Sequence, residues 1–242
     1  MAKAVNRARP PASGRNKPPK TSSAAPPRMP ISVYLLLAAG ALIFAGGLAG
    51  LLFSLHARSQ QLTGPTISGN LPAADFTLND QNGQAVQLAA LRGKVVALTF
   101  LYTNCPDVCP LIATNLGQAD QQLGAERANV VLLAVTVDPT NDTPAAVQKF
   151  DAEHQLQQQT NWHYLLGTVS QLTSVWKSYY VGSDAAQVAD APATKVSAPT
   201  PQLINHTAII YLIDRRGNLR VALDANFTPQ DFLHDVRVLA QQ

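Results

Sequence analysis

The stretch KVVALTFLYTNCPDVCP, residues 94–110, joins an apolar run to the only two cysteines of the chain. Residues 94–102 are nearly all apolar, as expected of a strand that is buried on both faces. Helical spacing of apolar residues begins after the second cysteine. The thiols therefore fall where a central strand ends and a helix begins, which is where ligand and redox chemistry collects in open α/β sheets.

Strand-like and helix-like patterns alternate along the rest of the chain. The predicted strands are a hairpin within 75–91 that turns at Asn82-Gly83, then 94–102, 129–138, 162–166, 206–214 and 219–224. The predicted helices follow the cysteines, begin at Thr143-Pro144 with Thr143 as N-cap, and cover 169–180 and 229–239. This order predicts an α/β sandwich with a central mixed sheet.

The N-terminal part of the chain predicts a membrane anchor. Residues 1–30 carry seven Lys or Arg, six prolines and no acidic residue before Met29, which is typical of a disordered tail. Residues 31–55 then run 25 positions without a charge, enough for a transmembrane helix, which needs about 20 residues. A cleaved signal peptide is the alternative, although its apolar core would span only about 7–15 residues.

The distribution of charge predicts the orientation of this anchor. Because the positive flank precedes the span, we expect a single-pass plasma-membrane protein with a cytoplasmic N-terminus and an extracytoplasmic functional domain. The chain has 18 Lys and Arg, and removing the seven of the tail leaves 11 against 15 acidic residues. The basic character of the chain therefore belongs to the tail, where it is interpreted as a topology signal; membrane lipid is an expected partner and nucleic acid is not. The glycines and prolines of residues 56–73 predict a linker, and residues 74–242 form one domain.

The cysteine pair, Cys105 and Cys109, is a poor structural staple. A disulfide between them would close a five-residue loop, which the chain-entropy model credits with only about 2 kcal/mol. Because a residue before proline avoids the α region, we expect a turn here, with Cys109 as N-cap and Pro110 as the first helical residue. The helix N-terminus would lower the pKa of both thiols. The spacing permits a disulfide or a bound metal ion and does not choose between them.

A third ligand would distinguish a metal site from a plain dithiol. Four of the five histidines have the positions of ordinary surface or packing residues, namely His56, His154, His163 and His234. His206 opens a predicted strand directly after the Ala/Pro-rich stretch 182–204, so its side chain can face a neighbouring strand end. Two interpretations stay open, a metal ligand or a histidine at the edge of a strand.

Three segments together resemble one protein family. FTLNDQNGQAVQLAALRGKVVALTFLYTNCPDVCP (76–110), VTVDPTNDTP (135–144) and NHTAIIYLIDRRGNL (205–219) resemble, in order and spacing, the Sco/SenC family of membrane-anchored copper chaperones. The resemblance covers about residues 72–240 and implies a thioredoxin-like fold after one N-terminal transmembrane helix.

The resemblance also implies a ligand set and partners. It places one copper ion on Cys105, Cys109 and His206, and thiolates suit Cu(I) whereas imidazole accepts Cu(I) or Cu(II). The implied partners are the copper-binding subunit of cytochrome c oxidase and a thiol reductant or copper donor protein. Asp138 has two interpretations, a carboxylate close to the metal or a residue that only sets the turn before Pro139.

Three functions compete for the dithiol. The resemblance implies a metallochaperone rather than an enzyme, one that helps assemble the binuclear copper centre of the oxidase and loads only when the CxxxC pair is reduced. The alternative is a thiol-disulfide reductase with Cys105 and Cys109 as its redox pair and Cys105 as the attacking thiol. A peroxidase-like thiol enzyme is disfavoured because its supporting threonine and arginine pocket is not evident. An inert cysteine pair is the third interpretation.

Overall fold

The structure is a computed structural model that describes residues 30–181 and 208–242, without the side chains of residues 55–59. It divides into two compact units, one ending at Phe53 and the other comprising Ser54–Gln242. Helix α1 (Ile31–Ser59) belongs mostly to the first. None of the residues in its segment Ile31–Ser54 is buried, and the segment is long and apolar enough to cross a membrane.

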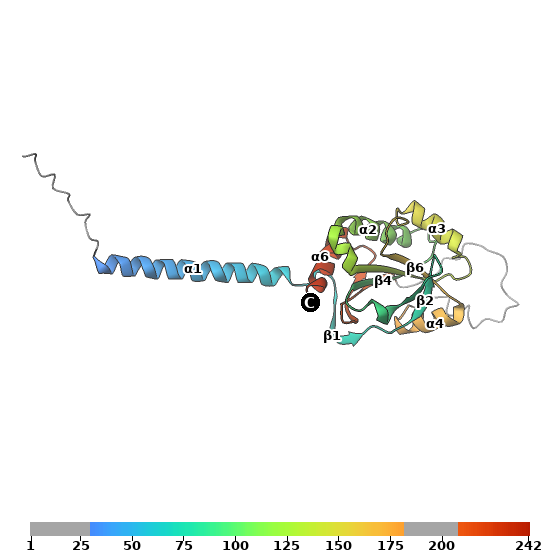
Figure 1. The fold of residues 1–242 in the computed structure, drawn as a ribbon, viewed down its shortest axis with the longest axis horizontal. Helices are drawn as coiled ribbons and strands as arrows, with labels where there is room; N and C mark the ends of the chain where they lie inside the picture. Colours follow the sequence, from blue (N-terminus) through green and yellow to red (C-terminus); the bar gives the residue numbers. More distant parts are fainter. Residues whose placement is uncertain (1–29, 182–207) are drawn as a thin grey trace, which may run out of the picture. The chain divides into compact units, whose positions relative to one another are not determined.

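The second unit is built on a mixed sheet. Eight strands among the described residues follow the order β1-β8-β7-β4-β5-β6-β2-β3 (Figure 1). The central strands β4, β5 and β6 are parallel, and the other pairs are antiparallel. Their bounds are β1 Thr66–Pro72, β2 Thr77–Asp80, β3 Ala85–Gln87, β4 Val95–Leu101, β5 Val130–Thr136, β6 Trp162–Leu166, β7 Ile209–Ile213 and β8 Asn218–Asp224.

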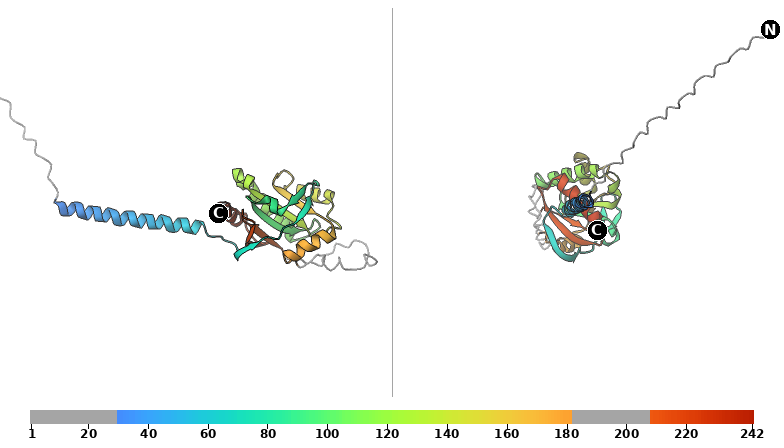
Figure 2. Two further views of the ribbon diagram at one scale, coloured as in Figure 1. Left: turned by 60° about the horizontal axis from the view of Figure 1, so that its bottom comes forward. Right: turned by 90° about the vertical axis from the view of Figure 1, so that its left-hand side faces the viewer.

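Helices cover the sheet on both faces. Helices α2 and α6 pack against one another, and α4 lies on the opposite face of the sheet from them (Figures 1 and 2). The described helices of this unit are α2 Val108–Leu123, α3 Pro144–Glu153, α4 Val169–Ser178 and α6 Pro229–Ala240, with 3-10 turns at Leu88–Leu91 and Gly124–Asn129. This arrangement confirms the predicted α/β sandwich with a central mixed sheet.

The buried strands explain why the apolar runs are continuous. All seven residues of β4 and all seven of β5 are buried, because each strand has neighbours on both sides and helices over both faces. The one polar residue within β4, Thr99, is satisfied by donating its hydroxyl to the Ile209 carbonyl at 3.1 Å. The prediction of a central strand at 94–102 is confirmed.

Turns and helix caps also follow the sequence closely. The Thr143 hydroxyl accepts a hydrogen bond from the Ala146 N–H, and Pro144 is the first residue of α3. The hairpin between β2 and β3 turns at Gly83, whose φ of 78° lies in the left-handed region that glycine adopts without strain. Both predicted features are confirmed.

One strand lies where the sequence analysis expects a linker. Residues Thr66–Pro72, within the range 56–73, form β1 and pair antiparallel with β8. This strand is at the edge of the sheet, six of its seven residues are exposed, and it contains a glycine and a proline. Its side chains therefore have no alternation of apolar and polar positions, which is the pattern by which a half-buried strand is recognised.

Candidate metal and thiol site

The two thiols lie together beyond the carboxyl end of β4. The Cys105 N–H donates to the Tyr102 carbonyl at 3.3 Å, which folds the chain back directly after the strand. The Cys109 N–H donates to the Cys105 sulfur at 3.4 Å. The predicted position of the thiols, where the central strand ends and its helix begins, is confirmed.

The start of α2 differs from the prediction. The helix begins at Val108, with Asp107 as N-cap, so Cys109 is its second residue and Pro110 its third. The predicted N-cap role of Cys109 is wrong. The first four N–H groups of a helix have no intrahelical acceptor, so the missing N–H of Pro110 costs nothing here. The Cys105 sulfur accepts the Cys109 N–H and thereby does part of the work of a capping side chain.

The pKa values of the two thiols are shifted in opposite directions. A hydrogen bond from the Cys109 thiol lowers the pKa of Cys105 to about 5, supported by the backbone N–H groups of Asp107 and Cys109 and opposed by burial. The same hydrogen bond raises the pKa of Cys109, as do burial and the negative charge of Asp142. The prediction that the helix end lowers both pKa values holds for Cys105 and is wrong for Cys109, because Cys109 must keep its proton to donate the hydrogen bond that stabilises the Cys105 thiolate.

The two cysteines also differ in exposure, and the one with the lower pKa is the more exposed. Cys105 keeps 8% of its surface exposed, whereas Cys109 is fully buried. A thiolate is both the nucleophile of disulfide exchange and the form that binds a metal. The cysteine with the larger exposed fraction is therefore also the one that ionises first, so we expect an incoming metal ion or disulfide to meet Cys105 before Cys109.

A buried carboxylate beside the thiols was not singled out by sequence reasoning. Asp142 is 4% exposed and accepts hydrogen bonds from the N–H of Thr103 at 2.9 Å and its hydroxyl at 2.7 Å. It also accepts from the hydroxyls of Thr136 and, at 3.0 Å, Tyr164. Burial raises the pKa of this carboxyl, against these hydrogen bonds. The sequence signal that could have identified Asp142 is its position in NDTP, at the end of the segment VTVDPTNDTP (135–144).

Asp138 has contacts that define a turn. Its carboxylate accepts from the Asn141 N–H at 3.3 Å and from the Asn141 side-chain amide at 2.8 Å. Its carbonyl accepts from the N–H groups of Asn141 and Asp142. These bonds shape the connection from β5 to α3. The other interpretation, a carboxylate close to a metal, stays a prediction.

His206 lies outside the described residues, so its role as third ligand stays a prediction. Three other histidines have ordinary contacts, which fits the interpretation given to them. These contacts are His154 Nδ1 with the Thr114 hydroxyl at 3.3 Å, His163 Nδ1 with Asp80 at 3.0 Å, and His234 Nε2 with the Gln61 carbonyl at 2.9 Å. Within residues 30–181 and 208–242, no group of three or more His, Cys, Asp or Glu side chains is placed to hold a metal ion.

The Asp142 network predicts a large effect on stability. Asp142→Ala removes the acceptor of four hydrogen bonds, so we expect the free energy of unfolding to fall by about 3 kcal/mol. Urea unfolding of the full chain, followed by the fluorescence of Trp162 and Trp176, measures this change. Glu153→Ala, which removes an exposed carboxylate, is the control and should change the value by less than about 0.5 kcal/mol. Equal effects of the two variants would contradict the assigned role of Asp142.

The hydrogen bond between the two thiols predicts that they are alkylated unequally. Iodoacetamide labelling, measured by mass spectrometry across pH, should modify Cys105 with a midpoint near pH 5 and leave Cys109 unmodified at neutral pH. Cys109→Ala removes the donor and should raise the midpoint toward about 8.5, the ordinary value of a thiol. Cys109→Ser keeps a donor, so its midpoint should stay low. A midpoint near 8.5 in the unaltered chain would show that the hydrogen bond does not form.

Comparison with known proteins assigns the family. The SCO1/SenC family model matches residues 65–241. The chain is 34% identical over 127 residues to the SCO1 protein homolog of Bacillus subtilis, a match that covers 52% of this chain and 64% of that protein. The chain therefore spans slightly less than two thirds of the length of this relative.

Solved structures show the same fold. Bradyrhizobium japonicum ScoI with copper bound has a TM-score of 0.57 and 29% identity, covering 70% of this chain and 99% of that one. BsSco, a member of the Sco family of cytochrome c oxidase assembly proteins in which a disulfide switch was identified, has a TM-score of 0.55 and 24% identity, covering 73% and 98%. The fold is thioredoxin-like, and the chain belongs to the SCO1/SenC family.

Proposed function

We propose that this chain is a membrane-anchored metallochaperone that binds copper through Cys105, Cys109 and His206. It helps assemble the binuclear copper centre of cytochrome c oxidase. The observation that carries the proposal is the contact between the two cysteines at the carboxyl end of β4, where the Cys109 N–H meets the Cys105 sulfur at 3.4 Å. Support comes from the family, because B. japonicum ScoI has been solved with copper bound.

Two adjacent thiolates and one imidazole suit the transport of copper. Soft sulfur ligands select Cu(I), and the imidazole of His206 tolerates Cu(I) and Cu(II). Copper leaves by ligand exchange with the copper-binding subunit of the oxidase and arrives from a copper donor protein.

The redox state of the pair gates loading. Oxidation joins the two sulfurs, releases two protons and two electrons to a disulfide oxidant, and removes both sulfur ligands at once. A thiol reductant restores the dithiol. The disulfide switch identified in BsSco supports this part of the proposal.

The anchor sets where this chemistry takes place. The apolar segment Ile31–Ser54 spans the plasma membrane once, with the basic N-terminal tail in the cytoplasm and the thioredoxin-like domain on the extracytoplasmic side. The domain is thereby held on the side of the membrane where the positive-inside rule puts the segment that follows the span.

Copper titration of the reduced full chain in detergent tests the ligand set. We expect one copper ion per chain, and Cys105→Ser or Cys109→Ser should abolish tight binding. His206→Ala should weaken binding about tenfold or more, equivalent to about 1.4 kcal/mol or more. His154→Ala is the matched control and should bind as the unaltered chain does, because the contact of the His154 Nδ1 is the hydroxyl of Thr114 on α2. Unchanged binding by His206→Ala would rule out the three-residue site.

A thiol-disulfide reductase is the second candidate, favoured by the pairing of an accessible, acidic Cys105 with a buried Cys109. Such a pair can attack a target disulfide with the first sulfur and resolve the mixed disulfide with the second. It would keep the cysteines of the oxidase copper site reduced.

One variant separates the two candidates. We expect His206→Ala to bind copper about tenfold or more weakly while it still reduces a model disulfide, because the imidazole takes no part in the exchange. Turnover of a disulfide peptide, assayed beside copper titration on the same preparation, measures both properties. If the variant keeps copper and loses turnover, the assignment of His206 to the metal is wrong.

A further inference from the structure

Five cationic side chains gather at the end of the domain opposite the thiols. We call this cluster, consisting of Arg92, Lys94, Arg215, Arg216 and Arg220, the basic end. Its residues come from the turn before β4 and from the turn and first residues of β8. The two turns are joined, because the Gly93 N–H donates to the Arg215 carbonyl at 2.8 Å and the Arg215 Nε donates to the Gly93 carbonyl at 2.9 Å.

Carboxylates balance only part of this charge. Asp214 is buried and accepts from Arg220 at 3.1 Å, and Asp75 is occupied by the N–H of Ala89 and the amide of Gln87. Arg92, Lys94, Arg215 and Arg216 are exposed, and in the described part of the chain none of the four forms an ion pair.

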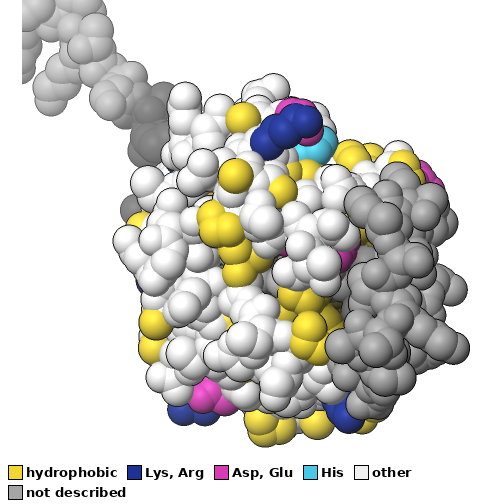
Figure 3. Space-filling view, turned by 90° about the vertical axis from the view of Figure 1, so that its right-hand side faces the viewer, with side chains coloured by type: hydrophobic (Ala, Val, Ile, Leu, Met, Phe, Trp, Pro, Cys, Tyr) yellow, Lys and Arg dark blue, Asp and Glu magenta, His cyan; other side chains and the backbone are white. Residues whose placement is uncertain are grey.

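The cluster contrasts with the rest of the domain. Residues 60–242 contain 10 Lys or Arg and 15 Asp or Glu, so the domain is acidic as a whole, yet half of its cations lie in the basic end. The face of the domain in Figure 3 shows few charged side chains, and several of them lie beside a side chain of opposite sign. The positive charge is therefore concentrated in one place rather than spread over a solvated surface.

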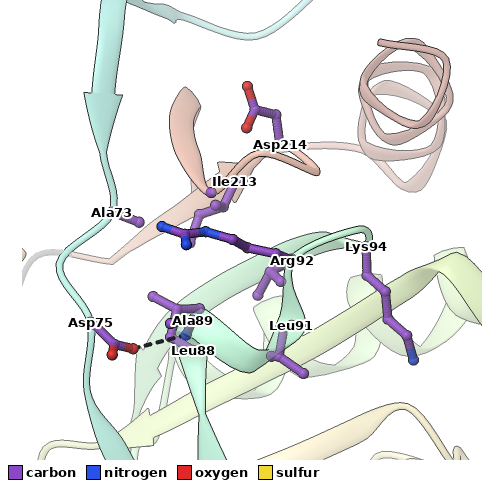
Figure 4. A pocket seen from close by; sticks show the side chains of 11 residues that line it. Ala73, Asp75, Leu88, Ala89, Leu91, Arg92, Lys94, Ile213 and Asp214 are labelled. Atoms are coloured by element: carbon purple, nitrogen blue, oxygen red, sulfur yellow. Dashed lines mark hydrogen bonds between the residues drawn. The ribbon is translucent and has the colours of Figure 1, made fainter.

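A pocket that is lined in part by Arg92 and Lys94 is too small for a ligand. Figure 4 shows Arg92 extending across it toward Ala73, whereas Lys94 points away. Its volume of about 40 Å³ has room for water molecules but not for a phosphate group with its substituents. The basic end is therefore suited to a charged surface rather than to a single small anion.

The chain enters the domain at this same end. The Gln60 amide donates to the Gln241 side chain at 2.8 Å, after the last turn of α6. The neighbouring C-terminal residues contact the basic end, because Arg215 donates to the Ala240 carbonyl at 3.2 Å and Arg220 to the Gln242 side chain at 2.8 Å. The buried carboxylate of Asp235 fixes the entering segment further, by accepting the N–H groups of Thr63 at 2.7 Å and Gly64 at 3.0 Å.

This entry point limits the distance from the membrane. The apolar span ends at Ser54, so residues 55–60 are all that separates it from the contact at Gln60. Six residues reach at most roughly 20 Å even when fully extended. A cluster beside Gln241 can therefore reach the lipid surface, where cations interact with anionic headgroups over a Debye length of about 8 Å.

We propose that the basic end docks on the anionic headgroups of the membrane that holds the anchor. This inference rests on the membrane-anchoring part of the proposed function. The cysteines follow the carboxyl end of β4, whereas Arg92 and Lys94 of the basic end precede its amino end. The seven residues of this strand span roughly 20 Å. Docking thus turns the thiols away from the lipid, toward a partner that approaches from the aqueous side.

Lysine labelling of the full chain in nanodiscs tests the docking. The chain is inserted into discs of phosphatidylcholine alone or mixed with phosphatidylglycerol, and acetylation by an N-hydroxysuccinimide ester is followed residue by residue by mass spectrometry. In the anionic discs we expect labelling of Lys94 to slow about fivefold or more relative to Lys149, which is exposed on α3. At about 1 M salt, where the Debye length is ~3 Å, the difference should disappear.

Charge variants provide the matched control. Arg92→Gln combined with Arg216→Gln should restore labelling of Lys94 in anionic discs, and neither side chain has a hydrogen bond within the described residues that the change would break. Lys177→Gln, which removes a cation from α4, should leave the protection intact. Labelling of Lys94 is compared between the two kinds of disc in the unaltered chain, so the result of that comparison does not depend on any variant.

Two results would overturn the proposal, and they differ from one another. If Lys94 labels equally fast in both discs although the chain co-elutes with them, the docking is refuted and the anchor stands. If the chain does not co-elute with the discs, the anchor and the docking both fail.

Discussion

The buried carboxylate of Asp142 is the constraint on which the geometry of the site depends. A charge in the interior costs several kcal/mol unless hydrogen bonds replace its lost hydration. Asp142 obtains these bonds from the segment after β4, from the end of β5 and from β6, through Thr103, Thr136 and Tyr164. Satisfying one charge therefore requires all three segments to be in place, and the first of the two thiols, Cys105, follows Thr103 by two residues.

The hydrogen bond between the two thiols makes the cysteines unequal. It opposes ionisation of Cys109, as do the burial of that thiol and the charge of Asp142, and it favours the thiolate of Cys105. The turn thus carries one thiol that ionises readily, Cys105, and a second whose ionisation is opposed, Cys109. A carrier needs this arrangement as much as a reductase does, because the first sulfur captures the copper or the disulfide and the second completes the exchange.

Sequence patterns predicted most of the fold because most of its elements are determined by residues that are neighbours in the sequence. The apolar run before the thiols, the Asn82-Gly83 turn and the Thr143-Pro144 cap each act through neighbouring residues. The edge strand β1 could not be predicted, since its exposed side chains have no periodicity. The start of α2 depends on a sulfur that accepts an N–H, which a rule about proline does not anticipate. Asp142 was missed because two of its partners lie 39 and 22 positions away in the sequence.

X-ray absorption at the copper edge tests the central claim most directly, which is that two sulfurs and one imidazole meet at a single ion. In the reduced, Cu(I)-loaded full chain, we predict two sulfur ligands at about 2.3 Å and one nitrogen at about 2.0 Å, taking the zinc distances as a guide. In His206→Ala the nitrogen should vanish while both sulfurs remain. A nitrogen that persists in this variant, or a single sulfur in the unaltered chain, would contradict the account.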